Sequence, residues 1–178
     1  MSGLGDFELF LLIFGSPALI ASLIGLVETK ELIYRDIRKG LAKFYEWTVP
    51  LLYYWEIVLA MWVMMYRYPF FGSLMLVMVA FLALYTGGFL KGRALGGVNS
   101  PRIDYVILAL NVLIYLVIPA YVVLFKEGIS VSAVIYFTIA ILYFGYSFSV
   151  LREVHRIAQK RGVTQNYWEA CESSSGET

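Results

Sequence analysis

Residues 47–90 read WTVPLLYYWEIVLAMWVMMYRYPFFGSLMLVMVAFLALYTGGFL, two long apolar runs on either side of a short turn at residues 66–69. Each run is close to the ~20 residues with which a helix, rising ~1.5 Å per residue, crosses about 30 Å of hydrocarbon. A segment in contact with lipid must satisfy its own backbone hydrogen bonds, so both runs are predicted to be helices. The stretch therefore predicts a transmembrane helical hairpin.

Comparable apolar runs fill most of the chain, in which 60% of the 178 residues are hydrophobic, against ~45–50% in a soluble domain. The sequence therefore predicts an all-α fold, a polytopic transmembrane helix bundle with five spans. One domain is expected over residues 1–161, followed by a disordered cytoplasmic tail at 162–178. The predicted spans cover residues 7–27, 48–66, 70–90, 103–125 and 129–150. Pro17 and Pro119 are expected to kink two of them.

The basic residues predict the orientation of this bundle. The chain has 14 Lys and Arg residues, and all except Arg67 and Lys126 fall in connections or ends on the same side. By the positive-inside rule this side is cytoplasmic, so the N-terminus is expected outside and the C-terminus inside the cell membrane. Because topology accounts for these cations and the net charge is only +1, no nucleic-acid partner is expected.

The connection between the first two predicted spans, Glu28–Glu46, has an amphipathic pattern. At 100° per residue its apolar and charged side chains separate onto two faces of a helix. The pattern predicts an interfacial amphipathic helix that rests on anionic headgroups or against a partner subunit. The alternative is a plain cytoplasmic linker. The apolar face consists of Ile33, Tyr34, Ile37, Leu41, Phe44 and Tyr45.

Glu56 is the most informative single residue, because it lies about 12 Å into the second predicted span, counted from Thr48. An ionised acid at that depth costs about 3 kcal/mol, so Glu56 is expected to be neutral or paired. Asn111 is expected at the same depth on the fourth span. Glu56 is either a structural acid that hydrogen-bonds across the bundle or an acid that faces a ligand. The candidate ligand-binding residues are Glu56, Asn111, Tyr53, Tyr54 and Trp55.

A second candidate site follows the third predicted span, in the glycine-rich segment from Lys91 to Asp104. Lys91 and Arg93 supply cations, and Asp104 lies at the start of the next helix, where an acid is favourable. These three residues are expected to contact a headgroup or another anion. The glycine spacing matches neither a P-loop nor a dinucleotide fingerprint. The alternative is a flexible loop whose cations only set topology.

Several chemistries are excluded by composition. The single histidine, His155, and the single cysteine, Cys171, lie outside the predicted spans. A haem held by two histidines and a histidine-rich metal site are therefore excluded, as is an intramolecular disulfide. No nucleophile, base and orienting residue form a visible triad. No metal or covalent cofactor is expected, and catalysis by this chain alone is not expected.

A family resemblance adds to this interpretation. The chain has four motifs in order: Gly25-Leu26-Val27-Glu28-Thr29-Lys30, Trp55-Glu56-Ile57-Val58-Leu59-Ala60, Arg67 and the glycine-rich segment. With them, the layout from Ser22 to about Ile118 resembles the DoxX, DoxD and MauE-like membrane proteins. MauE-like members often carry a cysteine pair after the third helix, where this chain has Gly87–Gly97 without cysteine. The resemblance implies a subunit or assembly factor of a quinone-linked respiratory or thiol-oxidising system, with Glu56 matching the family's glutamate in helix two.

Three functional hypotheses follow from these observations. The first is an integral membrane accessory subunit or assembly factor of a redox system, with a quinone or lipid pocket near Glu56. Its partner is another membrane protein or a second copy. The second is a small-solute or ion transporter or channel in which Glu56 and Asn111 line the path. The third is a lipid-modifying enzyme that uses the segment from Lys91 to Asp104 at the membrane surface.

Overall fold

The computed structural model describes residues 5–66, 68–95, 101–125 and 130–160, which form helices and no strand. The first helical unit consists of α1 (Gly5–Phe10), the π-helical turn η1 (Leu11–Gly15) and α2 (Ser16–Arg35). Two long helices follow, α3 (Ile37–Tyr66) and α4 (Pro69–Leu95). The last elements are α5 (Pro101–Val112), the π-helical turn η2 (Leu113–Val117), α6 (Ile118–Leu124) and α7 (Val131–Lys160). The predicted all-α fold is confirmed.

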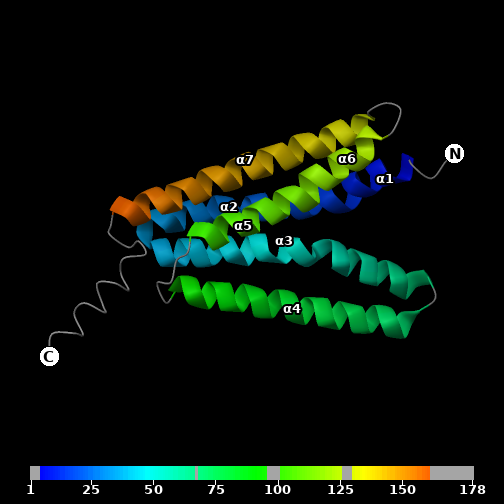
Figure 1. Ribbon diagram of the computed structural model, residues 1–178, viewed down its shortest axis with the longest axis horizontal. Coiled ribbons are helices and arrows are strands. Elements are labelled where there is room, and N and C mark those ends of the chain that lie inside the picture. The colour runs from blue at the N-terminus through cyan, green and yellow to red at the C-terminus, as the bar shows by residue number, and fades with distance from the viewer. Residues whose placement is uncertain (1–4, 67, 96–100, 126–129, 161–178) are drawn as a thin grey trace.

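The bundle is arranged around α3 (Figure 1). Helices α2, α5 and α7 contact α3 on one side, and α7 also contacts α2 and α5, while α4 packs along the opposite side of α3. Within the described part of the chain, α4 shares an extensive contact with α3 alone. Helix α3 therefore lies between α4 and the rest of the bundle, with side chains facing both.

Four helical segments are long and apolar enough to cross a membrane: Phe7–Arg35, Pro69–Leu95, Arg102–Leu124 and Val131–Lys160. They overlap four of the five predicted spans, with 7–27 and 70–90 contained in full and 103–125 and 129–150 contained except for one or two residues at an end. The remaining predicted span, residues 48–66, lies in α3, which is not among the four found in the described residues. The middle of this predicted span contains Glu56, preceded by Tyr53, Tyr54 and Trp55.

The stretch predicted to form a separate interfacial helix, Glu28–Glu46, is divided between two long helices instead. Helix α2 continues to Arg35, Asp36 has an extended backbone, and α3 then begins. The Asp36 carboxylate accepts hydrogen bonds from the backbone N–H groups of Arg38 and Lys39, 3.0 and 3.3 Å away, and so caps α3. Of the predicted apolar face, Ile33, Ile37, Leu41, Phe44 and Tyr45 are buried in the protein's own core, so this face is not free to lie on lipid.

Hydroxyl groups from neighbouring helices donate to carbonyls near the prolines, and at Pro119 the bonded carbonyl, that of Tyr115, is the one that the proline frees. A proline has no N–H for a carbonyl in the preceding turn, and the freed carbonyl needs another donor in an apolar setting. A π-helical turn precedes both Pro17 and Pro119, the two predicted kink sites, and Pro50 lies inside α3. In each case a hydroxyl donates to a nearby carbonyl: Tyr54 to Phe14 at 2.8 Å, Ser22 to Trp47 at 3.3 Å and Tyr136 to Tyr115 at 2.7 Å.

A glycine allows α2 to pack closely on α3. A Cβ atom added at Gly25 would lie 2.0 Å from Cε2 of Trp47, far inside any contact distance. Gly15 has a similar position, because its added Cβ would lie 2.7 Å from the Tyr136 ring. Small residues therefore let aromatic side chains of α3 and α7 fill the space beside the first helix, as in tightly packed membrane helices.

Candidate functional site

Glu56 lies on the surface of the described bundle and makes no hydrogen bond or ion pair with the residues that the structure describes. Tyr45, eleven residues earlier on the same helical stripe, is buried and contacts α5 through Asp104, whereas Tyr53, three residues before Glu56, contacts α4 through Thr86. Glu56 is nevertheless exposed, so the described helices do not cover this part of the stripe.

The three aromatic residues before Glu56 contact three different parts of the fold. The Tyr53 hydroxyl lies 3.4 Å from that of Thr86 on α4, and the Tyr54 hydroxyl donates to Phe14 in η1. The Trp55 ring packs between Phe10 and Tyr115, with ring centroids 5.3 and 5.7 Å away. The structure therefore does not gather Tyr53, Tyr54 and Trp55 around the Glu56 carboxylate.

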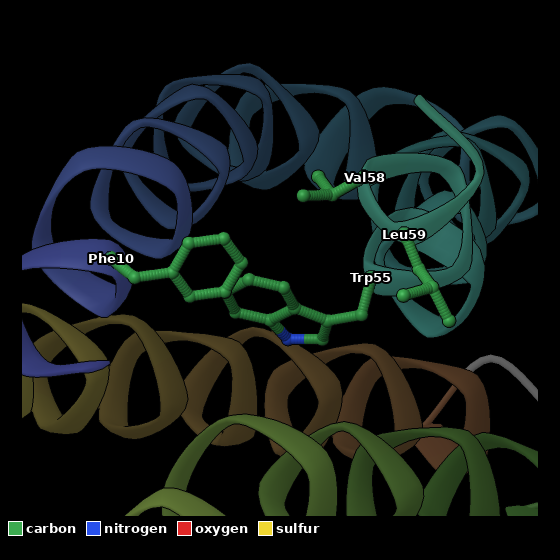
Figure 2. A pocket seen from close by; sticks show the side chains of 4 residues that line it. All are labelled: Phe10, Trp55, Val58 and Leu59. Carbon is green, nitrogen blue, oxygen red and sulfur yellow. The ribbon is translucent and has the colours of Figure 1, made fainter. Parts of the chain in front are cut away.

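An apolar hollow lies beside Trp55. Phe10 of α1 and Trp55, Val58 and Leu59 of α3 line a space of about 360 Å³ (Figure 2). The phenyl and indole rings lie next to each other, and the indole nitrogen is on the ring edge turned away from Val58. Glu56 is not among the lining residues. The hollow has the size of a small ligand site, for which ~300–1,000 Å³ is typical, but its walls are apolar.

Asn111 is buried and is not brought together with Glu56. Its amide nitrogen donates to the carbonyl oxygens of Thr48 and Ile107, each 3.1 Å away. Thr48 precedes Glu56 by eight residues, about 12 Å along α3, so the expected equal depth of Asn111 and Glu56 is wrong. Tyr115, one turn further along, donates to Leu51 and fixes the same register. A transport path lined by both Glu56 and Asn111 gains no support from this arrangement.

A buried cluster of titratable side chains lies where α3, α5 and α7 meet. The Tyr45 hydroxyl donates to Oδ1 of Asp104, and Nε2 of His155 lies 2.8 Å from Oδ2 of the same carboxylate. The Asp104 side chain is 0% exposed and that of His155 is 15% exposed. Nδ1 of His155 lies 3.5 Å from the Tyr105 hydroxyl. One buried carboxylate thus joins three helices that are distant in sequence.

Electrostatics keep Tyr45 in its donor role. Burial, and then the negative charge of Asp104 and its hydrogen bond, raise the pKa of Tyr45 far above its ordinary value, while Arg93 opposes the rise. The phenol therefore remains protonated and available to the carboxylate.

Among the described residues no three His, Cys, Asp or Glu side chains gather as a metal site.

The predicted headgroup contacts, Lys91, Arg93 and Asp104, are separated by the fold. Lys91 Nζ lies 3.6 Å from the Glu46 carboxylate on α3, at the surface. The Arg93 guanidinium lies 5.6 Å from the centre of the Phe89 ring, and its charge acts on Tyr45. Asp104 is instead buried and bonded to Tyr45 and His155. The three residues therefore do not form one surface site.

Sequence reasoning missed the partners of Asp104. The sequence pattern predicts an acid at a helix start, and Asp104 does lie in the first turn of α5. The usable signal was topological, because Asp104 and His155 lie near the same end of two neighbouring antiparallel helices. His155 also continues the buried face of α7 beyond Leu151 and Val154, which marks it as part of the packed helix.

Comparison with protein-family models, with curated proteins and with solved structures gave no match for this chain. The resemblance to the DoxX and MauE-like proteins therefore stays a hypothesis based on its motifs.

Proposed function

We propose that this protein is an integral membrane accessory subunit that holds the hydrocarbon chain of a membrane lipid or an isoprenoid quinone beside Trp55. The observation that carries the proposal is the apolar hollow of about 360 Å³ lined by Phe10, Trp55, Val58 and Leu59. Apolar and aromatic walls suit a hydrocarbon chain, because they offer it close van der Waals contact over an apolar surface.

The chemistry of the walls favours a chain over a polar head. A quinone ring or a phosphate needs hydrogen-bond donors, and three of the four lining side chains carry no polar atom. The fourth, Trp55, turns its nitrogen to the ring edge away from Val58 (Figure 2). A quinone-linked system is what the family resemblance implies, and the isoprenoid tail is the part of a quinone that this hollow suits.

The proposal includes the five-span topology, with α3 as the span not found by length and composition. The cation distribution supports an outer N-terminus and a cytoplasmic C-terminus. Trp55 then lies about 10 Å from the start of its span at Thr48, at a depth where lipid chains are the surrounding solvent. The buried cluster at Asp104 joins helices at the cytoplasmic end, and the protein acts in the cell membrane together with a partner.

Native mass spectrometry of gently extracted protein tests this function. Leu59→Trp should fill the hollow, whereas Leu84→Trp places the same ring on the exposed face of α4, where Leu84 is 76% exposed. We expect a bound lipid or quinone on the wild type and on Leu84→Trp, and its loss from Leu59→Trp. The adduct mass distinguishes a phospholipid from a quinone. Equal adducts on all three proteins, or none on the wild type, would contradict the proposal.

A further inference from the structure

The Glu56 carboxylate lies on a partly exposed stripe of α3, whose first residue Leu52 also packs against the core, and it has no hydrogen-bond or ion-pair partner within the described chain. Leu52, Glu56, Leu59 and Val63 follow one another at helical spacings of four, three and four residues, so they lie on one face. All four side chains are at least partly exposed, and Leu59 is 51% exposed. The stripe is thus an apolar strip of helix surface with one carboxylate near its middle.

A carboxylate in this setting calls for a partner from outside. In the proposed topology Glu56 faces hydrocarbon, where an isolated charge costs about 3 kcal/mol on insertion scales. No hydrogen bond or ion pair with a described residue offsets that cost. Charge complementarity therefore points to a cation at the same depth.

A second copy of this chain cannot supply that cation. All 14 Lys and Arg residues, and the single His, lie outside the five predicted spans. A symmetric contact would instead place Glu56 of each copy near the other, and like charges oppose each other. Asn111 cannot serve either, because it is buried and its amide nitrogen donates to Thr48 and Ile107 in the core.

We propose that the stripe formed by Leu52, Glu56, Leu59 and Val63 binds one transmembrane helix of a different protein, which carries Lys or Arg at the depth of Glu56. Leucine and valine supply the apolar packing surface, and Glu56 selects the basic residue. The proposal rests on the membrane topology of the proposed function and identifies the chemistry of the partner. Leu59 borders both the stripe and the hollow, so the two tests use different substitutions.

The test uses the full chain in lipid nanodiscs with synthetic leucine-rich transmembrane helices, and binding is measured by energy transfer. One helix carries a single central Lys, the second carries none, and the third carries Lys two turns nearer its end. We expect the wild type to prefer the central-Lys helix over the helix without Lys by roughly threefold to fifteenfold, the range of interhelical polar contacts. The third helix should lose this preference because its charge lies at another depth.

Two variants identify the carboxylate as the cause. Glu56→Gln should bind all three helices alike, while Met61→Gln, on an exposed position elsewhere around α3, should keep the preference. Far-ultraviolet circular dichroism checks that both variants are folded. Equal binding of the helices by the wild type, or a preference that survives Glu56→Gln, would overturn the proposal. So would self-association of the wild type that is lost in Glu56→Gln, because a second copy would then cover the stripe.

Carbodiimide labelling separates these failures from a failure of the topology. A hydrophobic carbodiimide should modify Glu56 in membranes, whereas a water-soluble one should not. Modification by the water-soluble reagent alone would place α3 outside the hydrocarbon and overturn the proposed topology, and with it this inference. Loss of the bound lipid in the hollow test bears only on the proposed function.

Discussion

Removing the His155 side chain should destabilise the fold strongly, because it leaves the Asp104 carboxylate buried without its cationic or N–H partner. The carboxylate is 0% exposed and His155 Nε2 lies 2.8 Å from it. Breaking such a buried pair from one side costs about 3–5 kcal/mol. His155→Ala is therefore expected to lower the free energy of unfolding by about that amount.

The loss of unfolding free energy should be smaller when the Asp104 carboxylate is removed together with His155. The double variant Asp104→Leu, His155→Leu leaves only the Tyr45 hydroxyl without its acceptor, a loss of about 1–3 kcal/mol. The double variant is thus expected to be more stable than His155→Ala. This non-additivity distinguishes an electrostatic pair from simple packing, which would make the double variant the least stable.

Equilibrium unfolding in mixed micelles, followed by circular dichroism, measures these differences. Gln159→Ala serves as the control, because Gln159 is exposed on the same helix and its removal should change the free energy of unfolding by less than about 0.5 kcal/mol. If His155→Ala costs no more than this control, Asp104 is not paired in the way described. If the double variant loses as much free energy of unfolding as the two single variants lose together, Asp104 and His155 are not coupled.

Three further predictions follow from the same structure. Gly25→Ala should lower the free energy of unfolding by about 1–3 kcal/mol, because its Cβ would lie 2.0 Å from Trp47. Gly145→Ala is the control and should be neutral or stabilising, because no atom lies within 4 Å of an added Cβ there. Unfolding titrations of both variants measure the difference. Tyr136→Phe should lower the free energy of unfolding by about 1–3 kcal/mol, because it removes the hydroxyl that donates to the Tyr115 carbonyl. The same substitution should lower it less in a Pro119→Ala background, where residue 119 again has a backbone N–H for that carbonyl, and unfolding titrations measure both effects. Because the pKa of Tyr45 is raised in the folded chain, the stability it contributes is complete below about pH 10 and is lost as the pH rises above that value. Thermal unfolding from about pH 8 to about pH 11 should therefore show a steeper decline for the wild type than for Tyr45→Phe, and parallel curves would contradict this.

The long apolar runs made the helical fold predictable, because lipid-length segments leave the backbone no alternative to helix. The boundary at Asp36 was harder to predict. The segment from Glu28 to Glu46 has a clean amphipathic pattern, but a pattern says only that one face is buried and not what buries it. Here Leu41 and Phe44 meet the protein's own core, and the Asp36 cap divides the segment.

The candidate site was predictable only in part. Counting residues from the start of each apolar run placed Asn111 level with Glu56, but depth in a bundle depends on the register between helices. That register is fixed by contacts such as Asn111 with Thr48 and Tyr115 with Leu51, which no single helix encodes. The pairing of Asp104 with Tyr45 and His155 needs three helices at once, so the residue pattern of each alone could not reveal it.

The polar side chains inside this bundle mostly serve other polar groups of the same chain. Hydroxyls of Ser22, Tyr54 and Tyr136 donate to carbonyls near the helical prolines, and the Asp104 carboxylate accepts from two neighbouring helices. Such pairing is what an apolar environment demands, since each unsatisfied group costs free energy. Within the described residues, buried polar atoms of Ser16, Trp47, Asn111 and Tyr143 have no partner, and the exposed Glu56 carboxylate has none either. A carboxylate that the chain itself does not satisfy, on an exposed stripe of a central helix, is most simply explained by a partner that brings the missing donor.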